Sequence, residues 1–140
     1  MKALSIRQPW ASLILTGSKR IENRTWSTQY RGPLFIHTGL QIDQDAIPFA
    51  PRRGSQQLQA LLQLRGVLMG KVMLVDVHEF TEADIDPFAE GPYCFVLESP
   101  AIFYEPVPTR GHPGLFTVPD SLVEHIDKRQ KLHSQSRTHK

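Results

Sequence analysis

The run GVLMGKVMLVDVHEF, residues 66–80, constrains the fold more than any other feature of the chain because it is the strongest strand candidate in the sequence. Closely spaced apolar and β-branched residues predict a long β-strand here. Gly70 lies inside the run, where glycine weakens a flat strand but permits a sharp bend. We therefore expect a long strand with a bulge or a barrel corner at Gly70.

Shorter strand candidates on both sides of this run predict a mainly β protein with short helices. Pro100 separates two of these candidates, which we expect to be distinct strands. The expected segments are KALSIR at 2–7, the extended RIENRTW at 20–26, GPLFIHT at 32–38, PYCFVLES at 92–99, AIFYEPV at 101–107 and a short strand within GHPGLFTVP at 111–119.

Four short helices are expected between and after the strands. The first follows Pro9, which suits a first helical turn, and we expect Gly17 to end it in a left-handed conformation. The others are a short helix after Asp43, QQLQALLQL at 56–64 with Ser55 as its cap, and SLVEHIDKRQ at 121–130, with Leu122 and Ile126 inward.

The length of 140 residues predicts one compact domain, which we assign to residues 1–130. The tail 131–140 has almost nothing apolar to bury, so we expect it to be mobile. No window approaches the roughly 18 apolar residues of a membrane span, and the N-terminus lacks the core of a signal peptide. These features predict a cytoplasmic protein with no membrane partner.

Cys94 is the chain's one cysteine, so an internal disulfide and a multi-cysteine zinc site are excluded. We expect this thiol to be buried and inert. The six histidines are scattered, without an HxxxH pair or an adjacent carboxylate in ligand spacing. The sequence therefore predicts no metal site and no cofactor.

Charge is unevenly distributed along the chain. Residues 1–40 hold six basic side chains and one acidic, a net charge of +5, whereas residues 65–98 hold two basic and seven acidic, a net charge of −5. A concentrated positive lobe attracts polyanions, so a nucleic acid or a phosphorylated ligand is the natural partner. The alternative is a solvated basic face that binds nothing.

Several separated motifs resemble the ASCH-domain family, in the family's order. They are QPWA at 8–11, GxKxxExR formed by Gly17, Lys19, Glu22 and Arg24, then Trp26, RGPLFIH at 31–37, GKVMLVDV at 70–77, EGPYCFVLE at 90–98 and PVPTRGHPGLF at 106–116. The resemblance implies an α+β, mainly β, PUA-like fold, a partly open β-barrel with flanking short helices and a basic cleft near GxKxxExR. It also implies binding of RNA or modified bases and, in some members, hydrolysis of RNA or of an acylated cytidine nucleoside.

Lys19 and Glu22 are the candidate catalytic residues if the chain is a hydrolase. Lys19 can contact a phosphate, act as a base when desolvated, or be an ordinary exposed lysine. In the amidohydrolase-like branch a threonine stands three residues after the lysine, whereas Glu22 stands there in this chain, which weakens that interpretation. Glu22 can act as a general base, recognise a base amino group, or form a salt bridge with Lys19 or Arg24, which shares its face of an extended segment.

Two tryptophans and one histidine extend the candidate site. Trp10 shares a helical face with Leu13 and Ile14, which favours core packing, whereas Trp26 follows charged residues and is free to stack on a base. His37 can donate to a phosphate or serve as a structural histidine. Asp76, beside His78, completes a polar site only if its strand leads back to the cleft.

The sequence favours a nucleic-acid-binding module, with RNA as the preferred partner and a modified nucleoside as another ligand. The predicted binding residues are Arg7, Gln8, Trp10, Lys19, Glu22, Arg24, Trp26 and His37. The first alternative is a hydrolase, either a ribonuclease or a nucleoside amidohydrolase. The second is a protein-interaction module that uses the acidic stretch at 76–90.

Overall fold

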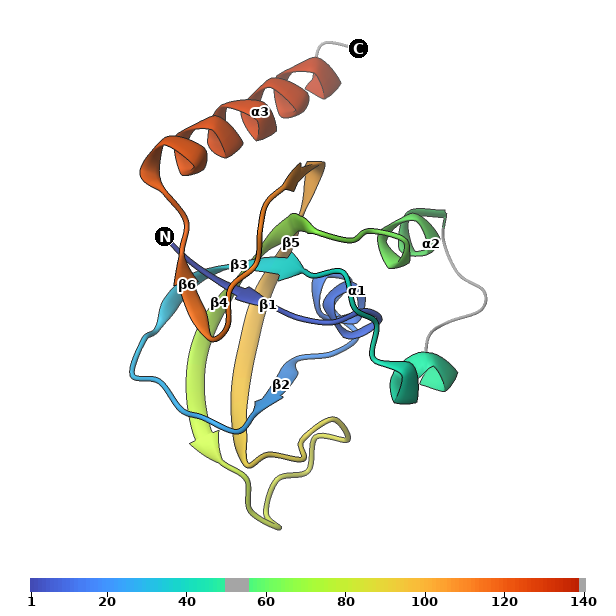
Figure 1. Ribbon diagram of the computed structural model, residues 1–140, viewed down its shortest axis with the longest axis vertical. Coiled ribbons are helices and arrows are strands. Elements are labelled where there is room, and N and C mark those ends of the chain that lie inside the picture. Colours follow the sequence, from blue (N-terminus) through green and yellow to red (C-terminus); the bar gives the residue numbers. More distant parts are fainter. Residues whose placement is uncertain (50–55, 139–140) are drawn as a thin grey trace.

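Six strands form one curled, mixed sheet in the computed structural model, which describes residues 1–49 and 56–138 (Figure 1). The strand order is β2-β5-β4-β3-β1-β6, with β1 parallel to β3 and every other neighbouring pair antiparallel. The strands are β1 (Lys2–Ser5), β2 (Ile21–Arg24), β3 (Gly32–Thr38), β4 (Val67–Glu79), β5 (Tyr93–Pro108) and β6 (Leu115–Thr117). The predicted α+β class, mainly β with a partly open barrel, is confirmed.

The predicted bend at Gly70 is confirmed. The pairing of β4 with β5 shifts register between Leu68 and Gly70. A Cβ atom at residue 70 would lie 2.2 Å from the carbonyl oxygen of Ala101, so only glycine lets the two backbones approach this closely.

The expectation of two strands separated by Pro100 is wrong, because β5 runs through this proline without a break. Ser99 adopts a positive φ of 52°, and register shifts on the facing β4 absorb the irregularity. A bulge therefore bends one strand where the sequence indicated a connection between two.

The helices are short except for the last. They are α1 (Trp10–Leu15), the 3-10 helix η1 (Gln44–Phe49), α2 (Gln56–Leu62) and α3 (Asp120–Thr138). Gly17 has the predicted left-handed φ of 84° after α1. The predicted cap Ser55 lies outside the described residues, and α3 extends eight residues past its predicted end at 130. Residues 131–138 are thus helical, and the mobility of the tail stays a prediction.

Both faces of the sheet are covered. Along β1 and β3, alternate residues enter two different cores, as the two-residue period of a strand requires. Leu4, Leu34 and Ile36 pack with α1 and α2 in one core, whereas Ala3 and Phe35 pack with Ile126 of α3 in the other. In the part of the chain that the structure describes, no helix has the length and hydropathy needed to span a membrane.

Candidate functional site

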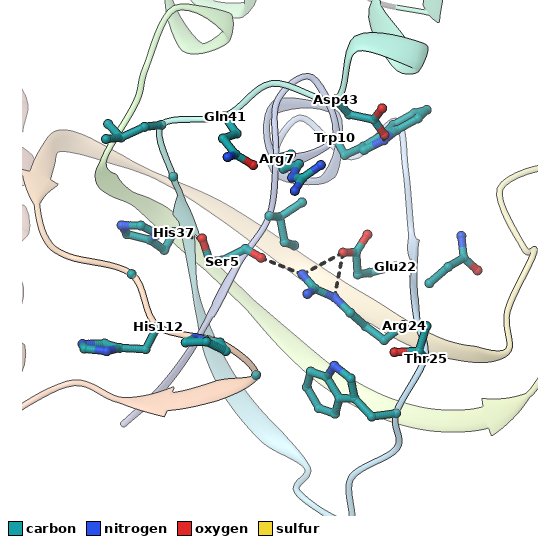
Figure 2. A pocket seen from close by; sticks show the side chains of 18 of the residues that line it. Ser5, Arg7, Trp10, Glu22, Arg24, Thr25, His37, Gln41, Asp43 and His112 are labelled. Carbon is teal, nitrogen blue, oxygen red and sulfur yellow. Dashed lines mark hydrogen bonds and ion pairs between the residues drawn. The ribbon is translucent and has the colours of Figure 1, made fainter.

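One open pocket of about 1430 Å³ lies where the parallel strands β1 and β3 end, beside α1 and β2 (Figure 2). Parallel strands end at the same edge of a sheet, which places Ser5 directly opposite His37. The segment 109–114, which precedes β6, and residues Phe88 and Glu90 complete the wall. Seven of the eight predicted binding residues line this pocket: Arg7, Trp10, Lys19, Glu22, Arg24, Trp26 and His37.

Lys19, Glu22 and Arg24 form a charge network on the pocket floor, in which Lys19 and Glu22 are buried and Arg24 is partly buried. The ammonium of Lys19 lies 3.2 Å from Oε1 of Glu22 and also donates to the carbonyl of Ile21. The guanidinium of Arg24 lies 3.0 Å from Oε2 of Glu22. Lys19 is 4% exposed and Glu22 is 8% exposed, so the alternative of a solvent-exposed lysine is wrong. Both oxygens of Glu22 have a cationic partner.

Arg24 joins this network to β1. Its Nη2 donates a 2.6 Å hydrogen bond to the carbonyl of Ser5, and Figure 2 shows the guanidinium between Ser5 and Glu22. Glu22 and Arg24 reach the same side because they are two residues apart on β2, as the sequence predicted. The network therefore fixes β2 against β1 and keeps a net positive charge in the floor.

Two hydrogen bonds hold the ring of His37 and define the tautomer of its neutral form. A carbonyl oxygen can only accept, so Nε2 donates to the carbonyl of Thr109 at 2.6 Å, and Nδ1 accepts from the hydroxyl of Ser5 at 2.9 Å. Burial lowers the pKa of His37, the hydrogen bond to Thr109 opposes this effect, and nearby His112 lowers the pKa further. The ring thus directs Nδ1 at the Ser5 hydroxyl, whereas the lowered pKa disfavours the imidazolium and makes His37 poorly suited to carry charge toward a phosphate.

The two tryptophans both combine packing with pocket lining. Trp10 donates from Nε1 to Asp43 at 2.9 Å, and Lys19 Nζ lies 5.3 Å from the Trp10 ring centroid. Trp26 packs edge-on against Phe95, with ring centroids 5.2 Å apart. Each indole is partly exposed and packs against the core. The predicted division between a core Trp10 and a cleft Trp26 is therefore not seen.

Gln8 does not line the pocket, in contrast to the prediction. Its side chain is 1% exposed, donates to the carbonyl of Leu61 at 2.8 Å, and accepts from the hydroxyl of Ser12 at 2.7 Å. These bonds tie the start of α1 to the end of α2. We therefore assign Gln8 to positioning the pocket wall, because a buried polar side chain needs such partners.

A profile of the ASCH domain matches residues 4–98, which is more than half of the chain. The chain belongs to the ASCH domain family. Human activating signal cointegrator 1 is 30% identical over 152 residues, a match that covers 96% of this chain and 25% of that protein. The mouse protein of the same name is 29% identical with the same coverage. The chain thus spans about a quarter of the length of these relatives.

Solved ASCH structures share the fold. The ASCH protein of Zymomonas mobilis superposes with a TM-score of 0.53 at 11% sequence identity, covering 91% of this chain and 93% of that chain. A mutant of the same protein superposes with a TM-score of 0.55. The ASCH domain has a PUA-like fold, which is generally associated with RNA binding.

Only some of the six basic side chains of residues 1–40 line the pocket of this ASCH domain. Lys2, Arg20 and Arg31 lie elsewhere and contact Thr117, Glu98 and Asp76, respectively. Four basic and three acidic side chains line the pocket, so its formal charge is +1 with its histidines neutral. The sequence alone did not identify Ser5, Asp43, Thr109, Arg110 and His112 as pocket residues, although the motif PVPTRGHPGLF contains the last three.

The acidic stretch at 76–90 of the ASCH domain lies mostly outside the pocket. Asp76 does not line the pocket and instead contacts Arg31 at 3.9 Å and His78 at 3.2 Å. Glu90 is the one acidic residue of this stretch among the described pocket residues. Across residues 1–49 and 56–138, one group of three potential metal ligands occurs, formed by His78, Asp84 and Cys94 outside the pocket.

Proposed function

We propose that this ASCH-family chain binds single-stranded RNA in the pocket, with Arg7 and Arg110 at its mouth contacting phosphates. The observation that carries the proposal is the exposure of these two arginines beside two tryptophans that line the same pocket. Within residues 1–49 and 56–138, neither arginine forms an ion pair. Their guanidinium groups are thus available to an anionic ligand, whereas Lys19 and Arg24 are bound to Glu22.

The size of the pocket supports a ligand larger than one base. Pockets for small molecules typically measure about 300 to 1000 Å³, and this pocket of about 1430 Å³ exceeds that range. Partly exposed indoles offer flat surfaces for unstacked bases, and each stacked base contributes about 1 to 3 kcal/mol to binding. An unpaired strand has such bases available, whereas the bases of a duplex are stacked on one another.

Salt dependence of binding tests the assignment of the two arginines. For a single strand, log affinity falls by about 0.7 per decade of salt for each phosphate neutralised. We therefore expect Arg7→Ala and Arg110→Ala each to weaken binding of a single-stranded oligonucleotide and to reduce this slope. Arg20→Ala is the matched control, because Arg20 is exposed, lies outside this pocket and pairs with Glu98 at 3.7 Å. The proposal would be contradicted if RNA affinity did not change with salt concentration. It would also be contradicted if Arg20→Ala lowered RNA affinity as much as Arg7→Ala does.

Tryptophan fluorescence tests base stacking separately. We expect RNA to quench the indole emission, and Trp26→Ala to weaken binding while the protein stays folded. Trp10→Ala is expected to affect stability as well, because Trp10 also bonds to Asp43 and lies against Lys19. If a folded Trp26→Ala protein bound RNA with wild-type affinity, Trp26 would not be part of the binding surface.

A second candidate function, hydrolysis of an acylated nucleoside, rests on the pair formed by Ser5 and His37. Ser5 Oγ is 2.9 Å from Nδ1 of His37, which is the arrangement of a serine nucleophile with its general base. In the proposed step, Ser5 Oγ bonds to the acyl carbon and its proton passes to His37 Nδ1 and then to the departing nitrogen or oxygen. Water then releases the acid and restores the hydroxyl of Ser5.

The space around Ser5 supports access by an acyl group. A Cβ atom at residue 111 would lie 3.3 Å from Ser5 Oγ, so a larger residue there would crowd the hydroxyl, whereas a Cβ atom at residue 39 would meet it at an ordinary 3.6 Å. A fluorophosphonate probe tests the nucleophile directly. We expect an adduct on Ser5, absent from Ser5→Ala and reduced in His37→Gln. If the probe does not modify the wild-type chain and the chain still binds RNA, the hydrolase proposal is wrong and the RNA-binding proposal stands.

A further inference from the structure

We propose that His78, Asp84 and Cys94 form a binding site for one divalent transition-metal ion of the zinc class. The site lies outside the pocket, and its assignment does not rest on the proposed RNA binding. Their potential ligand atoms all lie within 4.8 Å of one another. The topology brings them together, because His78 of β4 and Cys94 of β5 are direct partners in the antiparallel pairing. The connection between these strands, at the lower end of the sheet in Figure 1, returns Asp84 to the same place.

The three donors suit zinc or cobalt better than magnesium or calcium. Imidazole nitrogen, thiolate sulfur and carboxylate oxygen are the ligands that bind zinc, at about 2.0, 2.3 and 2.0 Å respectively. Magnesium and calcium prefer oxygen ligands alone. In a tetrahedral site these bond lengths place the donor atoms roughly 3.3 to 3.6 Å apart. The 2.7 Å between His78 Nε2 and Asp84 Oδ1 therefore needs to widen by less than about 1 Å.

Asp76 supplies the outer partner that metal-bound histidines usually have. Its Oδ2 lies 3.2 Å from Nδ1 of His78, on the side of the ring opposite to Asp84. A carboxylate that accepts from one ring nitrogen fixes the tautomer and directs the other nitrogen toward the metal. The loss of such an outer partner typically weakens metal binding about 10- to 100-fold. This arrangement distinguishes the site from a chance group of acidic side chains.

Metal binding at these residues releases protons, because a thiol binds a metal as the thiolate and an imidazole binds it through an unprotonated nitrogen. The site would therefore hold His78 as a neutral imidazole, Cys94 as a thiolate and Asp84 as a carboxylate.

The site would brace the loop that forms one wall of the pocket. Phe88 and Glu90 line the pocket from this loop, and Asn23 of β2 holds the loop in place. Asn23 donates to the carbonyl of Phe88 at 2.8 Å and accepts from the amides of Glu90 and Gly91 at 2.9 and 2.8 Å. The Sγ atom of Cys94 also contacts Asn23, at 3.8 Å. A bound metal would thus tie Asp84, at the start of this loop, to the strand that follows it.

Titration of the full, untagged chain with Co²⁺ tests the site. Because Cys94 is the one cysteine of the chain, a thiolate-to-cobalt charge-transfer band can arise from no other residue. We expect this band at one ion per chain and its disappearance when Zn²⁺ is added. Cobalt held only by histidines or carboxylates elsewhere gives no such band. A wild-type chain that shows no thiolate band would overturn the proposal.

Variants assign the remaining ligands. Cys94→Ser should abolish the band, and Asp84→Asn should weaken Co²⁺ binding at least tenfold. Asp76→Asn should weaken it about 10- to 100-fold while the band is retained at saturation. Glu82→Gln, an exposed carboxylate of the same loop, is the matched control and should leave binding unchanged. Because Asp76 is exposed, its variant keeps the test valid if Cys94→Ser fails to fold, and wild-type affinity in both aspartate variants would overturn the proposal.

Discussion

The pocket floor and the acidic stretch at 76–90 both crowd charged side chains, but they hold them differently. On the floor, the buried Lys19 and Glu22 and the partly buried Arg24 share one network in which each charge depends on its neighbours. In the acidic stretch the carboxylates are mostly exposed, and Asp76 is 56% exposed while it contacts Arg31. Burial rather than the number of charges therefore determines what a substitution costs, because water screens exposed pairs but not buried ones.

The largest expected effect comes from removing the carboxylate of the floor. Glu22→Ala leaves Lys19 and Arg24 as neighbouring cations without a counter-ion, and the loss of one member of a buried ion pair costs about 3 to 5 kcal/mol. Urea unfolding measures this loss of stability. The control Glu82→Ala, at an exposed carboxylate of the acidic stretch, should change stability by less than about 0.5 kcal/mol. Equal losses of stability in the two variants would show that burial does not determine the cost of removing a carboxylate.

A smaller effect is expected from filling space beside His37. In Gly111→Ala the new Cβ would lie 2.7 Å from Cε1 of His37, whose ring is held by two hydrogen bonds. Overpacking of this kind costs about 1 to 3 kcal/mol. Gly39→Ala is the control, since its Cβ meets Ser5 Oγ at an ordinary 3.6 Å. A fully stable Gly111→Ala protein would mean that His37 is not fixed as described.

The buried His37 also predicts a pH dependence. Its pKa in the folded chain lies below the ordinary value of 6.5, mainly because burial disfavours the charged form. As pH falls below 6.5, the unfolded chain therefore takes up a proton that the folded chain resists, and the free energy of unfolding decreases. His37→Gln should flatten this decrease in urea unfolding measured between neutral and acidic pH. An unchanged pH profile would show that His37 is not the group responsible.

The smallest effect is expected from the exposed pair of Arg31 and Asp76. Their 3.9 Å contact joins side chains that are 38% and 56% exposed. Such pairs contribute about 0 to 1 kcal/mol, so Arg31→Ala should lower stability by no more than that in thermal or urea unfolding. A loss as large as that of Glu22→Ala would show that exposure does not separate the two regions.

The sequence predicted most of the fold because its signals are local. The strand signals of KALSIR and GPLFIHT, the glycine inside β4 and the helix stop at Gly17 depend on neighbouring residues alone. The continuity of β5 through Pro100 could not be predicted in this way. It depends on register shifts against β4, which no local pattern reports.

Contacts within the candidate site could be predicted where one segment supplies both partners, and could not be predicted where the sheet order brings distant segments together. Lys19, Glu22 and Arg24 lie within six residues, so their contact followed from spacing. Ser5, His37 and Thr109 meet only because β1 lies between β3 and β6, over a separation of 72 residues between His37 and Thr109. The cluster of His78, Asp84 and Cys94 was not identified from sequence spacing, because it depends on the pairing of β4 with β5.

The most direct test of the contrast between the two charged regions is amide chemical-shift perturbation of the isotope-labelled chain titrated with a single-stranded RNA. We expect the perturbed amides to cluster around Arg7, β2 and residues 109–114, with weaker salt-sensitive shifts elsewhere. The amides of residues 76–86 should stay unperturbed, because this acidic stretch lies outside the pocket. Saturable shifts confined to residues 76–86, or no shifts at the pocket, would contradict the assignment of the pocket as the nucleic-acid-binding surface.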